Sequence, residues 1–98
     1  MSDLTLTKLV DSMEIPIHLD EFTLSLPRTA KIIHVGSYYN KVHIWYEYMN
    51  DPVNSTSKER KFRAIKTGVP FDKKPLDSTQ YIGTFTHGRK MRHLYEDK

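Results

Sequence analysis

The segment Lys31–Met49 contains two β-rich runs in which apolar and polar side chains alternate. Successive side chains of a β-strand point to opposite faces of its sheet, so the alternation predicts two strands, each with one buried face. Tyr39-Asn40 separates the runs, and asparagine tolerates the positive φ angle that a tight hairpin turn requires. We therefore predict an antiparallel hairpin that turns at these two residues.

A two-residue turn at this position also predicts the register of the hairpin, because paired residue numbers then have a constant sum. The residues expected on its core side are Ile33, Val35, Val42, Ile44, Tyr46 and Tyr48, with Val35 opposite Ile44 and Ile33 opposite Tyr46. The pairs expected on the other side are His34 with Trp45, Ile32 with Glu47, and Gly36 with His43.

A second hairpin is predicted near the end of the chain. Tyr81–Thr86 and Arg89–Tyr95 are its two strands, and His87-Gly88 is the expected turn. The corresponding cross-strand pairs are Tyr81 with Leu94, Ile82 with His93, and Phe85 with Lys90.

Three further segments are strand candidates. Glu14–Leu19 alternates around Pro16, Phe22–Leu26 alternates up to Pro27, and Lys58–Lys66 places Phe62 and Ala64 on one face and Arg63 and Ile65 on the other. The first dozen residues fit either a short helix or an edge strand. Asn50–Ser57 and Thr67–Thr79 are predicted to be connections, since they are polar or contain Gly and Pro.

These elements predict a mainly β fold: a small antiparallel sandwich or a rolled, barrel-like sheet of five to seven strands, with the short N-terminal helix as one alternative. The 98 residues are enough for one domain, residues 1–98, with an N-terminal extension over 1–12 and a β body over 13–96. Short sheets leave open edges unless they close, so we expect a homo-oligomer, most simply a two-fold dimer.

Composition excludes several classes of chemistry. The chain has no cysteine, so it forms no disulfide, thiolate metal site or cysteine nucleophile. It has no Gly-x-Ser-x-Gly motif and no phosphate-binding glycine loop. A glycosidase needs two opposed carboxylates in a cleft, whereas the tight acidic pair Asp20-Glu21 is expected at a turn. We therefore expect no enzymatic activity and no cofactor. No run is long enough to span a bilayer and no signal peptide is apparent, so we expect a cytoplasmic protein without membrane contact.

Metal binding is not expected either. Neutral imidazole is a good ligand for zinc, copper and nickel, and the chain has five histidines. None of them has the spacing that would place two on one face of a helix or strand, except for the diagonal pair His34 and His43 in the first hairpin. Histidines half-exposed on strands are the simpler interpretation.

Charge is distributed unevenly along the chain. Residues 1–26 carry a net charge of −4 and residues 27–98 a net charge of +7. Either the basic part presents a face to anions, or the acidic segment folds back and neutralises it.

Basic and aromatic residues form the clearest functional pattern. Lys58–Lys66 and His87–His93 are two basic segments on different strands, which a sheet can place side by side. Arginine binds phosphate through a bidentate fork, and aromatic rings stack on bases. The candidate ligand-binding residues are Lys61, Arg63, Arg89 and Arg92, with His34, Trp45 and Tyr46 as ring contributors. The alternative is that these cations are ordinary solvent-facing side chains of strands.

Trp45 and His34 allow two interpretations. If both faces of the sheet are buried, Trp45 is a core residue, which is favoured because Ile32 is expected on the same face. If only one face is buried, an exposed tryptophan beside histidine is a contact residue for a protein or a ring-shaped ligand.

Several short motifs recur in an order that is typical of one family. They are Ala30–Gly36, the strand through Trp45, the Phe62 strand leading to Thr67–Pro70, Tyr81–Phe85 and His93–Glu96. Over residues 14–96 the chain resembles a family of short β-rich proteins of bacteriophages and prophage-carrying bacteria, for which no chemistry is assigned. The chain departs from the family pattern in residues 1–12 and at Arg92, where an aromatic residue is expected.

The resemblance implies a viral accessory origin, and small phage proteins of this kind often bind and disable a host component. Together with the basic–aromatic pattern, it predicts a non-enzymatic, host-defence-antagonising protein that sequesters a phosphate-bearing ligand such as a signalling nucleotide. Single-stranded nucleic acid belongs to the same ligand class. The alternative is an inhibitor that binds a host protein through aromatic and β-edge contacts.

Overall fold

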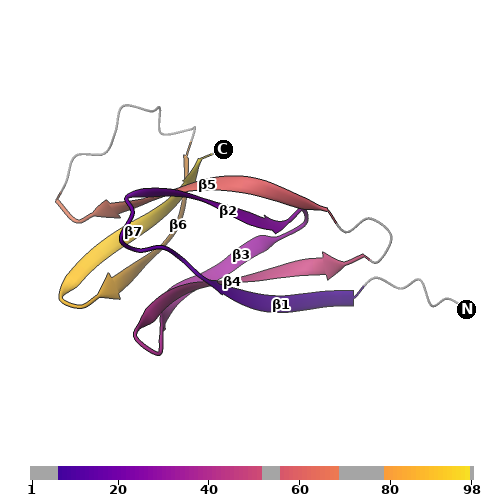
Figure 1. The fold of residues 1–98 in the computed structure, drawn as a ribbon, viewed down its shortest axis with the longest axis horizontal. Coiled ribbons are helices and arrows are strands. Elements are labelled where there is room, and N and C mark those ends of the chain that lie inside the picture. Colours follow the sequence, from indigo (N-terminus) through magenta and orange to yellow (C-terminus); the bar gives the residue numbers. More distant parts are fainter. Residues whose placement is uncertain (1–6, 52–55, 69–78, 98) are drawn as a thin grey trace, which may run out of the picture.

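The computed structural model describes residues 7–51, 56–68 and 79–97, and all of its regular secondary structure within these ranges is β-strand. The strands are β1 (Thr7–Glu14), β2 (Glu21–Pro27), β3 (Lys31–Tyr38), β4 (Lys41–Asn50), β5 (Ser57–Lys66), β6 (Thr79–His87) and β7 (Lys90–Asp97). Figure 1 shows their arrangement.

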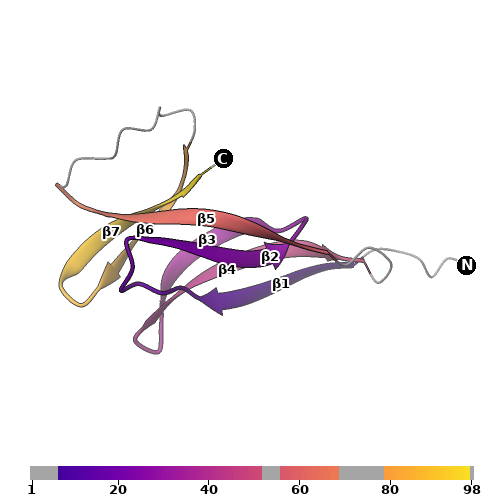
Figure 2. The same cartoon turned by 45° about the horizontal axis from the view of Figure 1, so that its top comes forward.

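The strands form two antiparallel sheets that face each other as a small sandwich (Figure 2). One sheet has the order β1-β4-β3 and the other has the order β2-β5-β7-β6. The predicted antiparallel β fold is therefore confirmed. The sheets approach each other most closely where β3 meets β6: the hydroxyl of Ser37 donates to the carbonyl of Thr86 at 3.1 Å. A Cβ atom at Gly83 would lie only 2.6 Å from Cγ1 of Val35, so this crossing requires glycine in β6.

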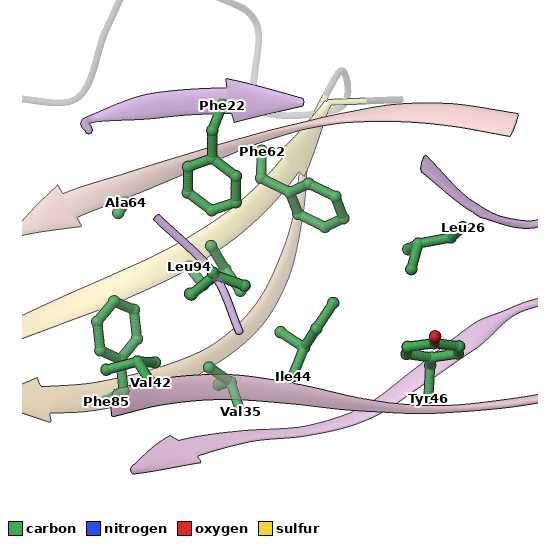
Figure 3. Packing of buried hydrophobic residues seen from close by; sticks show 11 residues of the cluster. Phe22, Leu26, Val35, Val42, Ile44, Tyr46, Phe62, Ala64, Phe85 and Leu94 are labelled. Atoms are coloured by element: carbon green, nitrogen blue, oxygen red, sulfur yellow. The ribbon is translucent and has the colours of Figure 1, made fainter. Parts of the chain in front are cut away.

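The core lies between the two sheets and draws side chains from both (Figure 3). Its buried members are Ile15, Phe22, Leu26, Val35, Val42, Ile44, Tyr46, Phe62, Ala64, Phe85 and Leu94. Phe22 and Phe62 come from the paired strands β2 and β5 and stack with ring centroids 5.7 Å apart. These two strands confirm the predicted strands at Phe22–Leu26 and Lys58–Lys66.

The first hairpin turns where the sequence predicts. Tyr39 and Asn40 both have positive φ angles, 51° and 63°, as the two central residues of a type I′ turn require. The predicted pairs of His34 with Trp45 and of Val35 with Ile44 are present, as is the third predicted pair, Gly36 with His43.

Further from the turn, an irregularity between Ile32 and His34 shifts the register by one residue. Ile32, instead of Ile33, pairs with Tyr46, and it packs against the core. Ile33 is 47% exposed, so its predicted core position is wrong, and so is the predicted pairing of Ile32 with Glu47. A β-bulge adds one unpaired residue to a strand, which reverses the face of every residue beyond it.

The second hairpin is present, but its turn lies one residue later than predicted. Gly88 and Arg89 form the turn, and Gly88 has a φ of 64°, as the first position of a type II′ turn requires. The predicted pairs are therefore wrong: Phe85 pairs with Arg92, Thr84 with His93, and Gly83 with Leu94. Phe85 and Leu94 each pair two positions away from their predicted partner, so they stay on the face of the predicted register, and both are buried. An irregularity between Tyr81 and Gly83 shifts the register again, and Tyr81 pairs with Tyr95 instead of Leu94.

The N-terminal region differs more from the prediction. Residues 7–14, part of which we expected in an extension, form the edge strand β1, and the helical alternative is wrong for them. The strand predicted at Glu14–Leu19 is also wrong. Ile15 continues the pairing with β4 through its N–H to the carbonyl of Val42, and the chain then turns, with Leu19 N–H donating to Pro16 O at 3.0 Å. Of the two predicted connections, residues 52–55 and 69–78 lie outside the described ranges.

Candidate functional site

The two strands that carry the basic segments, β5 and β7, pair with each other, and the segments themselves meet over two residue pairs, Ile65 with His93 and Lys66 with Arg92. Their cations do not form one open surface, however. Arg63 is only 4% exposed, and its Nε lies 3.3 Å from a carboxylate oxygen of Asp97. Lys61 is exposed and lies 3.6 Å from a carboxylate oxygen of Glu21. Arg92 also lies 3.5 Å from a carboxylate oxygen of Asp20, so three of the four predicted phosphate-binding cations already have carboxylate partners.

Two arginines, Arg60 and Arg92, lie on the inner side of the β2-β5-β7-β6 sheet, at opposite ends of the core. Arg60 shares the face of Phe62 in β5, and its Nη2 donates to Glu96 at 2.7 Å while its Nη1 donates to the carbonyl of Ala30 at 2.7 Å. The partial burial of Arg60 was not predicted. The signal was available, since Arg60 lies two positions before Phe62 in an alternating strand.

Arg92 lies at the other end of the core, opposite Phe85 of β6. Its Nη1 donates to the carbonyl of Ile17 at 3.0 Å and lies 3.5 Å from a carboxylate oxygen of Asp20. The arginine side chain is 14% exposed, whereas the Asp20 side chain is 76% exposed. Arg92 thus ties the turn after β1 to strand β7.

A hollow of about 440 Å³ lies where this turn meets the β6–β7 hairpin. The described residues that line it are Ile17, His18, His87, Gly88, Arg89, Lys90 and Arg92. Two of these, Arg89 and Arg92, are predicted binding residues. His18 and His87, which we predicted only as half-exposed strand histidines, join them because the turn at Ile17-His18 and the hairpin tip are neighbours in space. No described residue of the lining carries a carboxylate.

A second hollow of about 500 Å³ lies at the Arg60 end of the sandwich. It includes the predicted residue Lys61, and its other charged lining residues are Arg28, Lys58, Glu59, Arg60, Glu96 and Asp97. Cations and carboxylates are mixed there, and Glu96 is already bound by Arg60. This hollow is therefore less suited to an anion than the first.

The predicted ring contributors belong to the other sheet. Trp45 lies on the outer face of β4, half-buried among rings, with its centroid 5.3 Å from that of His34, 5.9 Å from that of His43 and 6.4 Å from that of Tyr38. The core interpretation of Trp45 is wrong, because the bulge moves Ile32 to the opposite, inner face. We call Tyr38, His34, His43 and Trp45, with the exposed Tyr39 beside Tyr38, the aromatic cluster.

Tyr46 is separate from the aromatic cluster. It is buried on the inner face of β4, and burial, followed by the negative charge of Asp11 and the neighbouring Tyr48, raises the pKa of its phenol. Its ring packs against that of Tyr48, with centroids 5.8 Å apart. The structure therefore brings together Arg89 and Arg92, and separately His34 and Trp45, but it does not join these two groups.

One imidazole is held within a chain of hydroxyl groups on the outer face of the β2-β5-β7-β6 sheet. The ring nitrogens of His93 lie 2.8 Å from the hydroxyl of Thr84 and 2.8 Å from that of Thr67, and the Tyr81 hydroxyl is hydrogen-bonded to Thr84. Both nitrogens of His93 thus have partners within the protein. Across the described ranges, no group of three His, Asp or Glu side chains is placed to hold a metal ion.

The uneven charge of the sequence is explained by ion pairs across the fold. Glu14, Asp20 and Glu21 of the acidic segment lie within 3.8 Å of basic groups, as Lys41–Glu14, Arg92–Asp20 and Lys61–Glu21 pairs. The acidic segment therefore folds back on the basic part of the chain. The described residues include no helix that is long and apolar enough to cross a membrane.

Comparison with known proteins places the chain in a family. No curated protein and no solved structure matches it. A family model described as "Domain of unknown function (DUF7352)" matches residues 7–98, from the first residue of β1 onward. The chain therefore belongs to the DUF7352 family, whose members share a domain without an assigned function.

Proposed function

We propose that this chain is a non-enzymatic binding protein that holds a phosphate-bearing ligand in the hollow between the turn after β1 and the β6–β7 hairpin. The observation that carries the proposal is the lining: Arg89, Lys90 and Arg92 converge with two histidines, and none of the described lining residues is acidic. Cations gathered in a concave surface focus their field and attract anions.

Arg92 supports the proposal because it is already fixed in position. Its described contacts with Ile17 and Asp20 both use Nη1, so Nε and Nη2 keep their donors for a ligand oxygen. A guanidinium that is held in place loses little side-chain entropy when it binds phosphate. Arg89, in the hairpin turn, and Lys90 beside it are exposed and add charge at the rim.

The size of the hollow suits a small ligand, because binding sites for small molecules commonly have volumes of roughly 300–1,000 Å³. The only rings in its described lining are the imidazoles of His18 and His87. Trp45 and Tyr46 lie in the other sheet, so in this proposal they do not stack on the ligand. The phosphate group, rather than the base, then supplies most of the recognition of a nucleotide.

The biological role is a further part of the proposal. The resemblance to phage and prophage proteins supports an accessory protein that acts in the host cytoplasm and antagonises host defence by sequestering a signalling nucleotide. A binding protein needs no catalytic group for this role, since holding the ligand lowers its free concentration.

Calorimetry with matched charge variants tests the site. We expect Arg89→Gln to weaken the binding of phosphate-bearing ligands about ten- to one-hundredfold, because a charge-assisted hydrogen bond contributes about 1.5–3 kcal/mol. Lys31→Gln removes the same charge from the other sheet and should change affinity less than about twofold at physiological salt, because distant exposed charges are screened. The ligands are pyrophosphate, linear and cyclic nucleotides, and short oligonucleotides, each at two salt concentrations.

Asp20 provides a second variant in the same experiment. Its carboxylate lies beside Arg92 and competes with an incoming anion for that guanidinium. Asp20→Asn should therefore strengthen binding, whereas a general effect of net charge would make Lys31→Gln as damaging as Arg89→Gln. Equal losses at Arg89 and Lys31 would contradict the proposed site.

The aromatic cluster favours a second candidate function, which is docking on a host protein. Tryptophan and tyrosine are enriched among the residues that dominate protein interfaces, and Tyr39 is 81% exposed at the tip of the β3–β4 hairpin. If no phosphate-bearing ligand binds, this surface becomes the better-supported site.

A further inference from the structure

Strand β1 is the outermost strand of its sheet and, among the described residues, pairs on one side only, with β4. Figures 1 and 2 both show it at the lower border of the molecule. It is eight residues long and contains no proline. Val10, on its outer face, is 60% exposed, and Leu9, on the inner face, is 38% exposed. A strand edge of this length, with neither proline nor a bulge, is a template for another strand.

The hydrogen bonds of β1 determine which residues a new strand can engage. The N–H of Ile15 donates to Val42 at 2.9 Å, so odd-numbered residues direct their N–H and C=O groups toward β4. The even-numbered residues Lys8, Val10, Ser12 and Glu14 therefore direct theirs toward the open edge. A two-fold antiparallel pairing of β1 with a second β1 must join even-numbered residues with even-numbered residues.

We propose that two copies of this chain associate through β1, in the antiparallel register centred on Asp11. This register places Lys8 opposite the partner's Glu14 and Leu9 opposite the partner's Met13, and the two-fold axis repeats each pair. Within one copy, Glu14 already pairs with Lys41, and Lys8 pairs with Glu47. The Lys8–Glu14 pairs between the two copies extend this row of alternating charges on the outer face of the sheet. Charge complementarity thus selects a second copy as the occupant of the edge.

The neighbouring permitted register, centred on Val10, is less favourable. It places Leu9 opposite the partner's Asp11, an apolar side chain against a carboxylate, and it separates Lys8 from Glu14. The register centred on Asp11 has one unfavourable feature, since the two Asp11 side chains face each other as a close, non-hydrogen-bonded pair. This repulsion limits the stability of the dimer and provides a test of the register. The dimer does not depend on the proposed ligand site.

Analytical ultracentrifugation of the full chain and its variants tests the association. The natural chain should show a reversible monomer–dimer equilibrium. Val10→Pro should make the chain monomeric at every concentration that gives dimer for the natural chain. Proline at this position removes an N–H that faces the open edge and leaves the bonds to β4 intact, so circular dichroism should still report the folded sheet.

Charge variants test the register. Glu14→Lys should weaken the dimer about tenfold, because two opposite-charge pairs become like-charge pairs. Adding Lys8→Glu should restore it, and Asp11→Asn alone should strengthen it. Glu59→Lys is the control: it reverses a charge at an exposed position of β5 and should not change the dimerisation constant. A natural chain that is monomeric throughout, or a dimer that survives Val10→Pro, would overturn the proposal. A dimer that Glu14→Lys leaves unchanged would overturn the register.

Discussion

Glu96→Gln should lower the free energy of unfolding by about 3 kcal/mol, because it removes the charge that compensates Arg60 in a largely buried ion pair. The side chains of Arg60 and Glu96 are 17% and 12% exposed, and the guanidinium contacts the carboxylate through Nε and Nη2. Loss of one partner from a buried pair costs about 3–5 kcal/mol, and the lower value applies since the amide oxygen still accepts a hydrogen bond. Urea denaturation measures the change.

The matched control is Glu21→Gln, the same substitution in an exposed ion pair. Glu21 lies 3.6 Å from Lys61, and both side chains are about half exposed. Exposed pairs contribute about 0–1 kcal/mol, so this variant should be nearly as stable as the natural chain. Replacing both Arg60 and Glu96 by Met should recover much of the loss, because no buried charge then remains. Equal costs for the two glutamine variants would contradict the role assigned to Arg60.

Phe62→Ala should lower the free energy of unfolding by about 3–5 kcal/mol, as expected when a large buried aromatic side chain is deleted. Phe62 is fully buried in the middle of the sandwich, stacks on Phe22, and lies between the two sheets (Figure 3). Its neighbours come from several strands, so they cannot collapse into the cavity without moving a sheet. The measurement is again denaturation in urea.

Ile33→Ala is the control for Phe62, and it also tests the bulge in β3. Ile33 is half exposed in the structure, whereas an uninterrupted strand would bury it. Surface substitutions usually change stability by less than about 0.5 kcal/mol, so this variant should be close to the natural chain. A loss of several kcal/mol at Ile33 would show that the strand continues without a bulge.

Alternation in the sequence predicts most of the strands correctly, because it reports directly which face of a strand is buried. It does not locate the bulge in β3. Ile32 and Ile33 are adjacent and both apolar, so either can be the buried one, and only the packing between the sheets decides. The turn of the second hairpin lies one residue later than predicted for a similar reason. Glycine can occupy either central position of a hairpin turn, and the neighbouring side chains do not show which of the two positions Gly88 takes.

The candidate site was predicted only in part. Basic residues on neighbouring strands could be recognised, but whether each one is free depends on carboxylates that are distant along the chain. Asp97 lies 34 positions after Arg63 and yet approaches it to 3.3 Å, which no local pattern reports. The hollow itself depends on the contact between Arg92 and Ile17, which are 75 positions apart. Predicting it would require the tertiary fold.

Amide chemical-shift mapping by NMR determines whether a phosphate-bearing ligand binds in the hollow beside Arg92. The chain, labelled with ¹⁵N, is titrated with pyrophosphate and with linear and cyclic nucleotides. We predict saturable shifts at the amides of His18, Gly88, Arg89 and Lys90, and none at the aromatic cluster around Trp45. An absence of saturable shifts with every ligand, or shifts confined to the β3–β4 hairpin, would mean that no phosphate-bearing ligand binds in this hollow.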